Sequence, residues 1–224
     1  MSGARVGPVG ASVALLVLAG AAVLAARASL PGARTQPAVP PCCEEPDGAA
    51  PAPAPGEPGG PLPVLGDVPD FSFTERSGRT VSRKDLVGRI WVADFIFTSC
   101  AGTCPVMTSR MAGVHQALRE EPGALCVSFS VDPERDTLDA LRAYANRYSA
   151  SADGWWFLRG PQKEVHRLEY EGFKMGDPED PMIHSERFVL VDRAGRIRGW
   201  YRGTEAEEVA RLLADAARLR GERP

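Results

Sequence analysis

The loop around which this chain is organised reads Phe95-Ile96-Phe97-Thr98-Ser99-Cys100-Ala101-Gly102-Thr103-Cys104-Pro105. Its first residues end an apolar run that predicts a buried strand, and the cysteine-bearing residues predict a short loop. Pro105 fits the first turn of a helix, where its missing N–H costs no hydrogen bond. Two thiols four positions apart at a helix start can serve redox chemistry, hold a metal ion or form a disulfide.

Alternating apolar and amphipathic stretches on both sides of this loop predict an α/β domain. Strands are expected at residues 71–74, 90–97, 124–131, 155–158, 187–191 and 196–201. Helices are expected after Pro105, after Asp136 as a capping residue, after Pro161, and after a capping box that begins at Thr204. This order is typical of a thioredoxin-like fold, with a central mixed sheet flanked by helices.

The amino-terminal part of the chain has a different composition. Residues 6–26 carry no charge and are numerous enough to cross a bilayer of about 30 Å as a helix. Residues 1–30 are therefore expected to be a transmembrane anchor, or a signal segment cleaved near Ala26-Arg27-Ala28. Proline, alanine and glycine dominate residues 31–63, which predicts a disordered linker before a folded domain at 64–224. Either alternative places the domain outside the cytosol.

Composition excludes two classes of protein. The net charge of −3 and the absence of a basic stripe argue against a nucleic-acid-binding protein. Five cysteines in 224 residues are too few, and the chain too long, for a disulfide-stapled mini-protein. Cys42 and Cys43 fall in the linker, where incidental thiols or a local disulfide are expected.

Cys100 and Cys104 fall where a central strand ends and a helix begins, which is where α/β sheets place ligands. Helix N–H groups favour the thiolate there, the form that binds metals and attacks disulfides. Thioredoxin-like oxidoreductases use a two-residue spacer and a cis-proline just before a later strand. Here the spacer has three residues, and His184 lies near the corresponding position.

His184 joins the cysteines if the strand from Arg187 lies beside the strand that ends at Phe97. Two thiolates and one neutral imidazole form a soft ligand set that suits Cu(I), whereas zinc normally takes a fourth ligand. Met182 could add a thioether. From the residues alone, metal binding, thiol–disulfide exchange and an inert pair of thiols remain open.

Three other side chains have simpler interpretations. His115 is expected at the edge of the core, because it follows Met111 by four positions on a predicted helix. His166 is expected at the boundary or in solvent. Cys126 is expected to act as a small hydrophobic residue inside a strand.

Three motifs together resemble the Sco/SenC family. They are Thr98-Ser99-Cys100-Ala101-Gly102-Thr103-Cys104-Pro105, Ser130-Val131-Asp132-Pro133-Glu134-Arg135-Asp136-Thr137, and Ile183-His184-Ser185-Glu186-Arg187-Phe188-Val189-Leu190-Val191-Asp192. The resemblance extends from about residue 64 to the end of the chain. It implies a membrane-anchored copper chaperone of thioredoxin fold that assists assembly of the Cu(A) centre of cytochrome c oxidase. It also implies that Cys100, Cys104 and His184 are the copper ligands.

The resemblance favours a metallochaperone over an enzyme with turnover, with the Cu(A)-bearing oxidase subunit or other copper-delivery proteins as partners. Oxidation of the two cysteines is expected to release the copper. The alternative is a membrane-anchored thiol–disulfide oxidoreductase that reduces the cysteines of the oxidase copper site. A peroxiredoxin-like peroxidase, which shares the fold, is a third hypothesis.

Overall fold

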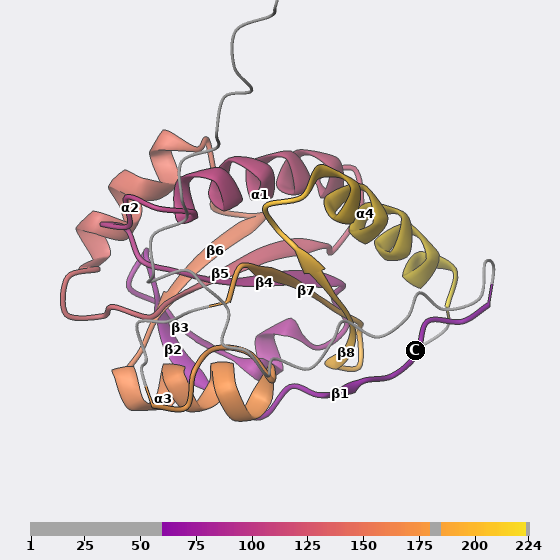
Figure 1. Ribbon diagram of the computed structural model, residues 1–224, viewed down its shortest axis with the longest axis horizontal. Helices are drawn as coiled ribbons and strands as arrows, with labels where there is room; N and C mark the ends of the chain where they lie inside the picture. The colour runs from indigo at the N-terminus through magenta and orange to yellow at the C-terminus, as the bar shows by residue number, and fades with distance from the viewer. Residues whose placement is uncertain (1–59, 180–184, 223–224) are drawn as a thin grey trace, which may run out of the picture. The chain divides into compact units, whose positions relative to one another are not determined.

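The computed structural model describes residues 60–179 and 185–222, which form one mixed sheet with helices on both faces (Figure 1). The strands are β1 (Gly66–Asp67), β2 (Ser72–Glu75), β3 (Thr80–Ser82), β4 (Trp91–Ile96), β5 (Leu125–Ser130), β6 (Trp155–Arg159), β7 (Arg187–Val191) and β8 (Arg196–Arg202). The helical elements are η2 (Arg83–Leu86), α1 (Cys104–Leu118), α2 (Leu138–Arg147), α3 (Gln162–Arg167), the π-helical turn η3 (Leu168–Gly172) and α4 (Ala206–Gly221). The spatial order is β1-β8-β7-β4-β5-β6-β2-β3.

The middle of the sheet is covered on both faces. β4 runs parallel to β5 and antiparallel to β7, and every residue of these three strands is buried. Because side chains alternate along a strand, Trp91 and Phe95 enter one core layer, and Val92 and Ile96 enter the other. The predicted thioredoxin-like α/β fold is confirmed.

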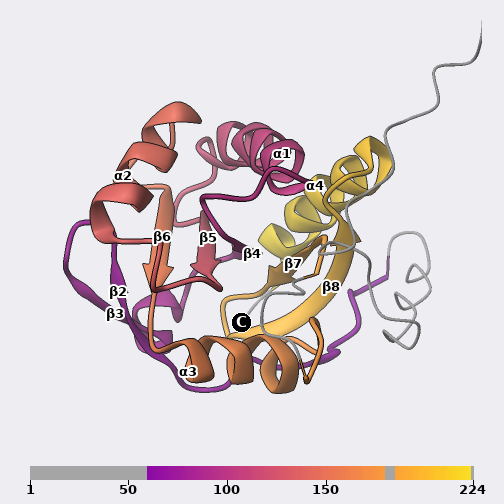
Figure 2. The same cartoon turned by 60° about the vertical axis from the view of Figure 1, so that its left-hand side comes forward.

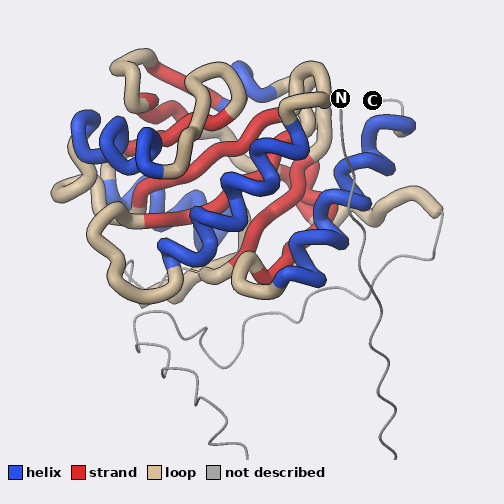
Figure 3. Tube along the Cα trace, turned by 90° about the horizontal axis from the view of Figure 1, so that it is seen from above, coloured by secondary structure: helices blue, strands red, loops and turns tan. Residues whose placement is uncertain are grey.

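Different helices cover the two faces (Figure 2). α1, α2 and α4 lie on one face, and α3 lies on the other. The α1 side packs Met107, Met111, Leu141 and Leu212 against the sheet, and Figure 3 shows these helices crossing the strands. The α3 side is rich in stacked and edge-to-face aromatic rings, which are contributed by Phe71, Phe73, Phe95, Phe129 and Phe173.

Two of the expected helix caps differ from the structure. Thr137, not Asp136, caps α2, because the Thr137 hydroxyl accepts the Ala140 N–H at 3.2 Å. Glu205 precedes α4, and within the described residues its side chain makes no capping hydrogen bond. The short strands β1 and β3, of two and three residues, were not expected from the sequence and form the two edges of the sheet.

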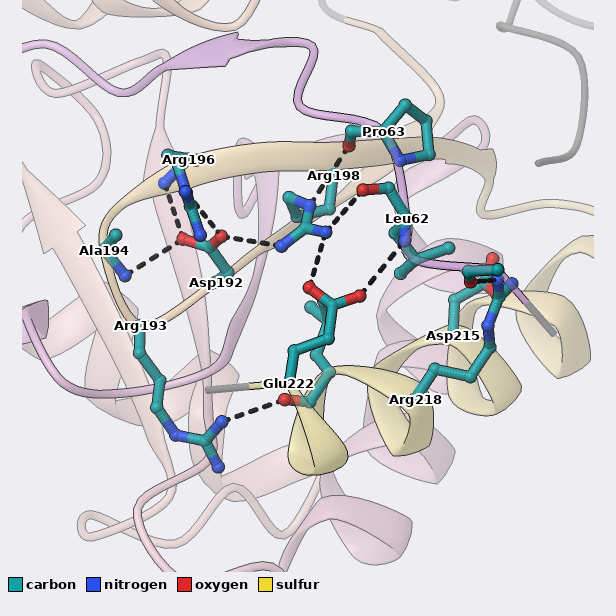
Figure 4. Close-up of polar contacts among 12 residues, drawn as sticks. Leu62, Pro63, Asp192, Arg193, Ala194, Arg196, Arg198, Asp215, Arg218 and Glu222 are labelled. Atoms are coloured by element: carbon teal, nitrogen blue, oxygen red, sulfur yellow. Dashed lines mark hydrogen bonds and ion pairs between the residues drawn. The ribbon is translucent and has the colours of Figure 1, made fainter. Parts of the chain in front are cut away.

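A buried arginine fastens the sheet at the start of β4, where the turn between β7 and β8 lies (Figure 4). Arg198, with 3% of its side chain exposed, donates to Asp192 at 2.8 Å and to Glu222 at 2.7 Å. It also donates to the backbone oxygens of Leu62 and Pro63, while the Leu62 N–H donates to Glu222. This cluster joins the first described residues of the chain to the end of α4.

The charge balance of this cluster favours ionised carboxylates. Burial alone would raise the pKa of Asp192. Hydrogen bonds from the Arg196 N–H and from the Arg198 and Arg196 side chains outweigh burial and hold that pKa below its ordinary value. Asp192 therefore stays ionised and neutralises Arg198.

In residues 60–179 and 185–222 no helix combines the length and apolar character that a bilayer crossing requires. The predicted anchor or signal segment at 1–30 lies outside the described residues, as does nearly all of the predicted linker.

Candidate metal site

Cys100 and Cys104 lie at the junction of β4 and α1, as the sequence predicts. The Cys100 N–H donates to the Phe97 oxygen at 3.2 Å, so the chain turns sharply as it leaves the sheet. Cys104 is the first residue of α1. Both residues are present as thiols and are buried, with 9% of Cys100 and none of Cys104 exposed.

The local backbone favours negative charge on Cys100. The Gly102 N–H donates to the Cys100 sulfur at 3.4 Å. A backbone N–H directed at sulfur stabilises the thiolate, and the positive end of α1 acts in the same direction. These backbone effects oppose the burial of the two cysteines, which disfavours the thiolate.

A buried carboxylate holds the start of the cysteine loop. Asp136 has no exposed surface and accepts hydrogen bonds from the Thr98 N–H at 3.1 Å and from the Thr98 hydroxyl at 2.6 Å. It also accepts from the Ser130 hydroxyl at 2.6 Å. Asp136 therefore connects the residues just before Cys100 to the end of β5.

Sequence reasoning assigned Asp136 to a helix cap and missed this role. The sequence did contain a signal for it. Thr98 follows the apolar strand β4, Ser130 ends the apolar strand β5, and the parallel pairing of these strands brings both hydroxyl groups to the same end of the sheet. Asp132, by contrast, makes only turn contacts here: its carboxylate accepts from the Arg135 side chain at 3.0 Å, and its backbone oxygen accepts the Asp136 N–H.

A polar contact lies beneath the first turns of α1. The Thr108 and Tyr144 hydroxyls lie 2.7 Å apart, and both residues are buried. Burial above all raises the pKa of Tyr144; the hydrogen bond with Thr108 partly offsets this, and the charges of Tyr148, Cys104 and Asp94 raise the pKa further. Tyr144 therefore stays protonated close to Cys104.

The strand pairing on which the histidine prediction depends is present. β7 lies antiparallel to β4, with Ala93 opposite Val189, so Ser185 lies at the end of the sheet that carries Cys100. His184 and Met182 lie outside the described residues. Among residues 60–179 and 185–222 there is no group of three His, Cys, Asp or Glu side chains that could hold a metal ion. The three-ligand set stays a prediction.

The remaining candidates occupy the expected environments. Cys126 is fully buried in β5, where burial and, second, the charge of Asp94 raise its thiol pKa well above the ordinary value. His115 is 4% exposed, and burial, followed by the charge of Arg119, lowers its pKa. His166 is half-buried and donates from Nε2 to the Asp177 oxygen at 2.6 Å.

A thioredoxin-like domain with two thiols where its central strand meets a helix belongs to a broad class of thiol-bearing α/β proteins. The SCO1/SenC family model matches residues 66–219, and the chain belongs to this family. It is 36% identical over 159 residues to a SCO1 protein homolog of Bacillus subtilis, and the match covers 68% of this chain and 82% of that relative.

Solved structures agree with this assignment. A SCO1/SenC family lipoprotein of Bacillus anthracis superposes with a TM-score of 0.65 at 32% identity, covering 72% of this chain and 99% of its own. BsSco, a Sco family cytochrome c oxidase assembly protein in which a disulfide switch was identified, gives 0.64 at 34%, covering 72% and 98%. Copper-bound ScoI of Bradyrhizobium japonicum shares the fold, with a TM-score of 0.55 at 24% identity, covering 68% and 99%.

Proposed function

We propose that this protein is a copper chaperone that binds copper through Cys100, Cys104 and His184. Its cargo would pass to the Cu(A)-bearing subunit of cytochrome c oxidase, because members of the Sco family act in assembly of that enzyme. One observation carries the proposal. The chain places two thiols on a single turn at the end of β4 and places Ser185, the neighbour of His184, at the same end of the sheet.

The chemistry of the donors supports copper over harder metals. Thiolates are soft ligands that select Cu(I), and an imidazole completes a set that fits the same ion. A site with three protein ligands keeps one side open, so that a receiving protein can offer its own ligands before the first ones leave. Delivery of a cargo metal requires this property.

We also propose that the described domain works outside the cytosol. Residues 1–30 would either anchor it to the membrane or export it and be cleaved. Similarity to a family member that is a lipoprotein supports an extracytoplasmic, membrane-attached domain.

Titration of the reduced full-length protein with Cu(I) under anaerobic conditions tests the site. We expect one copper per chain, and an affinity at least about 100-fold weaker in His184→Ala and in the double variant Cys100→Ser/Cys104→Ser. The matched control is Cys42→Ser/Cys43→Ser, which should bind like the wild type. Equal affinity in the wild type, the His184 variant and the Cys100/Cys104 variant would refute the proposal.

A second candidate is a thiol–disulfide oxidoreductase acting on the copper-ligand cysteines of the oxidase. The paired thiols and the disulfide switch identified in BsSco favour it. One thiolate would attack the target disulfide, release one target thiol and form a mixed disulfide. The second thiolate would then attack the first cysteine's sulfur and displace the other target sulfur, so that the target gains two thiols and this chain gains a disulfide.

Reduction of an oxidised Cu(A)-type subunit separates the two functions. The oxidoreductase requires both cysteines, but it does not require the imidazole. Full activity in His184→Ala, together with loss of activity in the double cysteine variant, would support the second candidate. Absence of peroxide consumption by the same reduced samples would exclude the peroxiredoxin-like peroxidase.

A further inference from the structure

Glu169 is a carboxylate with no exposed surface, in the π-helical turn η3 on the α3 face of the sheet. Glutamate is almost never fully buried unless it has partners. π-helical turns are rare, and they frequently mark functional positions.

Glu169 contacts the chain on both sides of residues 180–184. Its backbone oxygen accepts the Met175 N–H at 3.1 Å, and its carboxylate accepts the Ser185 N–H at 3.3 Å. Gly176 has a positive φ of +76°, and a Cβ there would lie 3.0 Å from Glu169 Cδ. One residue therefore links the chain before this segment to the chain after it.

The stretch that leads to residue 180 has two further attachments. The His166 Nε2 donates to the Asp177 oxygen at 2.6 Å, and the Trp200 indole N–H donates to the Phe173 oxygen at 2.9 Å. The first attachment comes from α3 and the second from β8. On the other side, Ser185 is 4% exposed and leads directly into β7.

We infer that Glu169 is a positioning residue for copper binding, an inference that rests on the proposed function. The Ser185 N–H belongs to the planar peptide unit that joins Ser185 to His184. By accepting that hydrogen bond, the buried carboxylate holds the backbone N–H of Ser185, the residue that follows His184. The imidazole then pays less conformational entropy when it joins the two sulfurs on copper.

The test compares three side chains at position 169 in the reduced full-length protein. Glu169→Gln keeps the oxygen acceptor and the volume, so its Cu(I) affinity should stay within about twofold of the wild type. Glu169→Asp retracts the acceptor by one methylene, and its affinity should fall about 10-fold, at the low end for partners that orient metal ligands. Thermal unfolding of each copper-free variant checks the fold.

A double-mutant cycle separates positioning from a general structural effect. If Glu169 acts through His184, Glu169→Asp should have no further effect on copper affinity in the His184→Ala background. An equal loss in both backgrounds would overturn the inference, as would wild-type affinity in Glu169→Asp while His184→Ala weakens binding. If instead the proposed copper site itself is wrong, His184→Ala will bind copper like the wild type, so the two failures are distinguishable.

Two further experiments do not depend on folding of the aspartate variant. Gly176→Ala would place a Cβ against the Glu169 carboxylate without changing its charge. We expect this variant to weaken copper binding when His184 is present and to have no further effect in the His184→Ala background. Amide hydrogen exchange at Ser185 should be at least about tenfold slower in the wild type than in Gly176→Ala or Glu169→Asp. Unchanged exchange in a folded variant would contradict the inference.

Discussion

The two ends of the sheet are held together by different means. Near the start of β4, the buried Arg198 donates hydrogen bonds to two carboxylates and two backbone oxygens, and it joins the first described residues to the end of α4. At the opposite end, single buried carboxylates accept the hydrogen bonds: Asp136 accepts from Thr98, just before Cys100, and Glu169 accepts from Ser185, the residue after His184.

This difference indicates a division of labour. The Arg198 cluster joins segments that are distant in the sequence, so its loss should affect global stability. The carboxylates at the other end act on short loops that carry the predicted ligands, so their loss should affect the site as well. Variants at each end can test whether stability and copper binding are separable.

The largest effect is expected from Arg198→Met. Removing the cation leaves Asp192 and Glu222 close together without their shared partner, and breaking a buried ion pair typically costs about 3–5 kcal/mol. Denaturant unfolding should show this loss, while the copper affinity of the folded protein stays unchanged. The control is Arg196→Met, whose side chain is 35% exposed and should cost about 1 kcal/mol or less. Equal costs for the two variants would contradict the argument.

A smaller loss of stability is expected from Asp136→Ala, but with an effect on the site. Thr98 and Ser130 would lose their acceptor, which should cost about 2–3 kcal/mol and weaken copper binding. Unfolding curves and Cu(I) titrations measure the two effects on the same samples. Asp139→Ala, an exposed carboxylate of α2, serves as the control and should change neither quantity. Wild-type copper affinity in Asp136→Ala would show that this carboxylate, like Arg198, affects stability alone.

The smallest effect concerns pH and His115, which lies about three turns from Cys104 along α1. Burial, and then the charge of Arg119, lowers the pKa of folded His115 below the ordinary 6.5. The unfolded chain therefore binds a proton first as pH falls, and stability declines from about pH 6.5 toward the folded pKa.

His115→Gln should remove this contribution, which amounts to a slope of at most about 1.4 kcal/mol per pH unit. Unfolding free energies of wild type and variant between pH 5 and 7 give the difference in slope. Identical slopes would mean that His115 does not cause the acid sensitivity.

The sequence was sufficient for those features that depend on local pattern. The long apolar runs predict β4, β5 and β7, and the loop after Phe97 places both cysteines correctly. The pairing of β7 beside β4, which was the condition for bringing His184 near the cysteines, is present in the structure. The edge strands β1 and β3 escaped prediction because two or three residues carry no readable periodicity.

The supporting carboxylates escaped for a different reason. Asp136 meets Thr98 across 38 positions, and a capping role offered a sufficient local explanation. Glu169 follows α3 in a helical pattern, where a glutamate normally faces solvent, and only the π-helical turn directs it inward. Both contacts depend on tertiary geometry that no single sequence window contains.

The short edge strands also limit how this domain can meet another protein. A partner that adds a strand to a sheet needs a row of exposed backbone N–H and C=O groups, and β1 and β3 offer only two and three residues. Strand addition onto β1 or β3 is therefore disfavoured, although β1 pairs with β8 only at Arg196 and Ile197. A protein that meets this domain at β1 or β3 is therefore expected to use side chains and loops rather than backbone pairing.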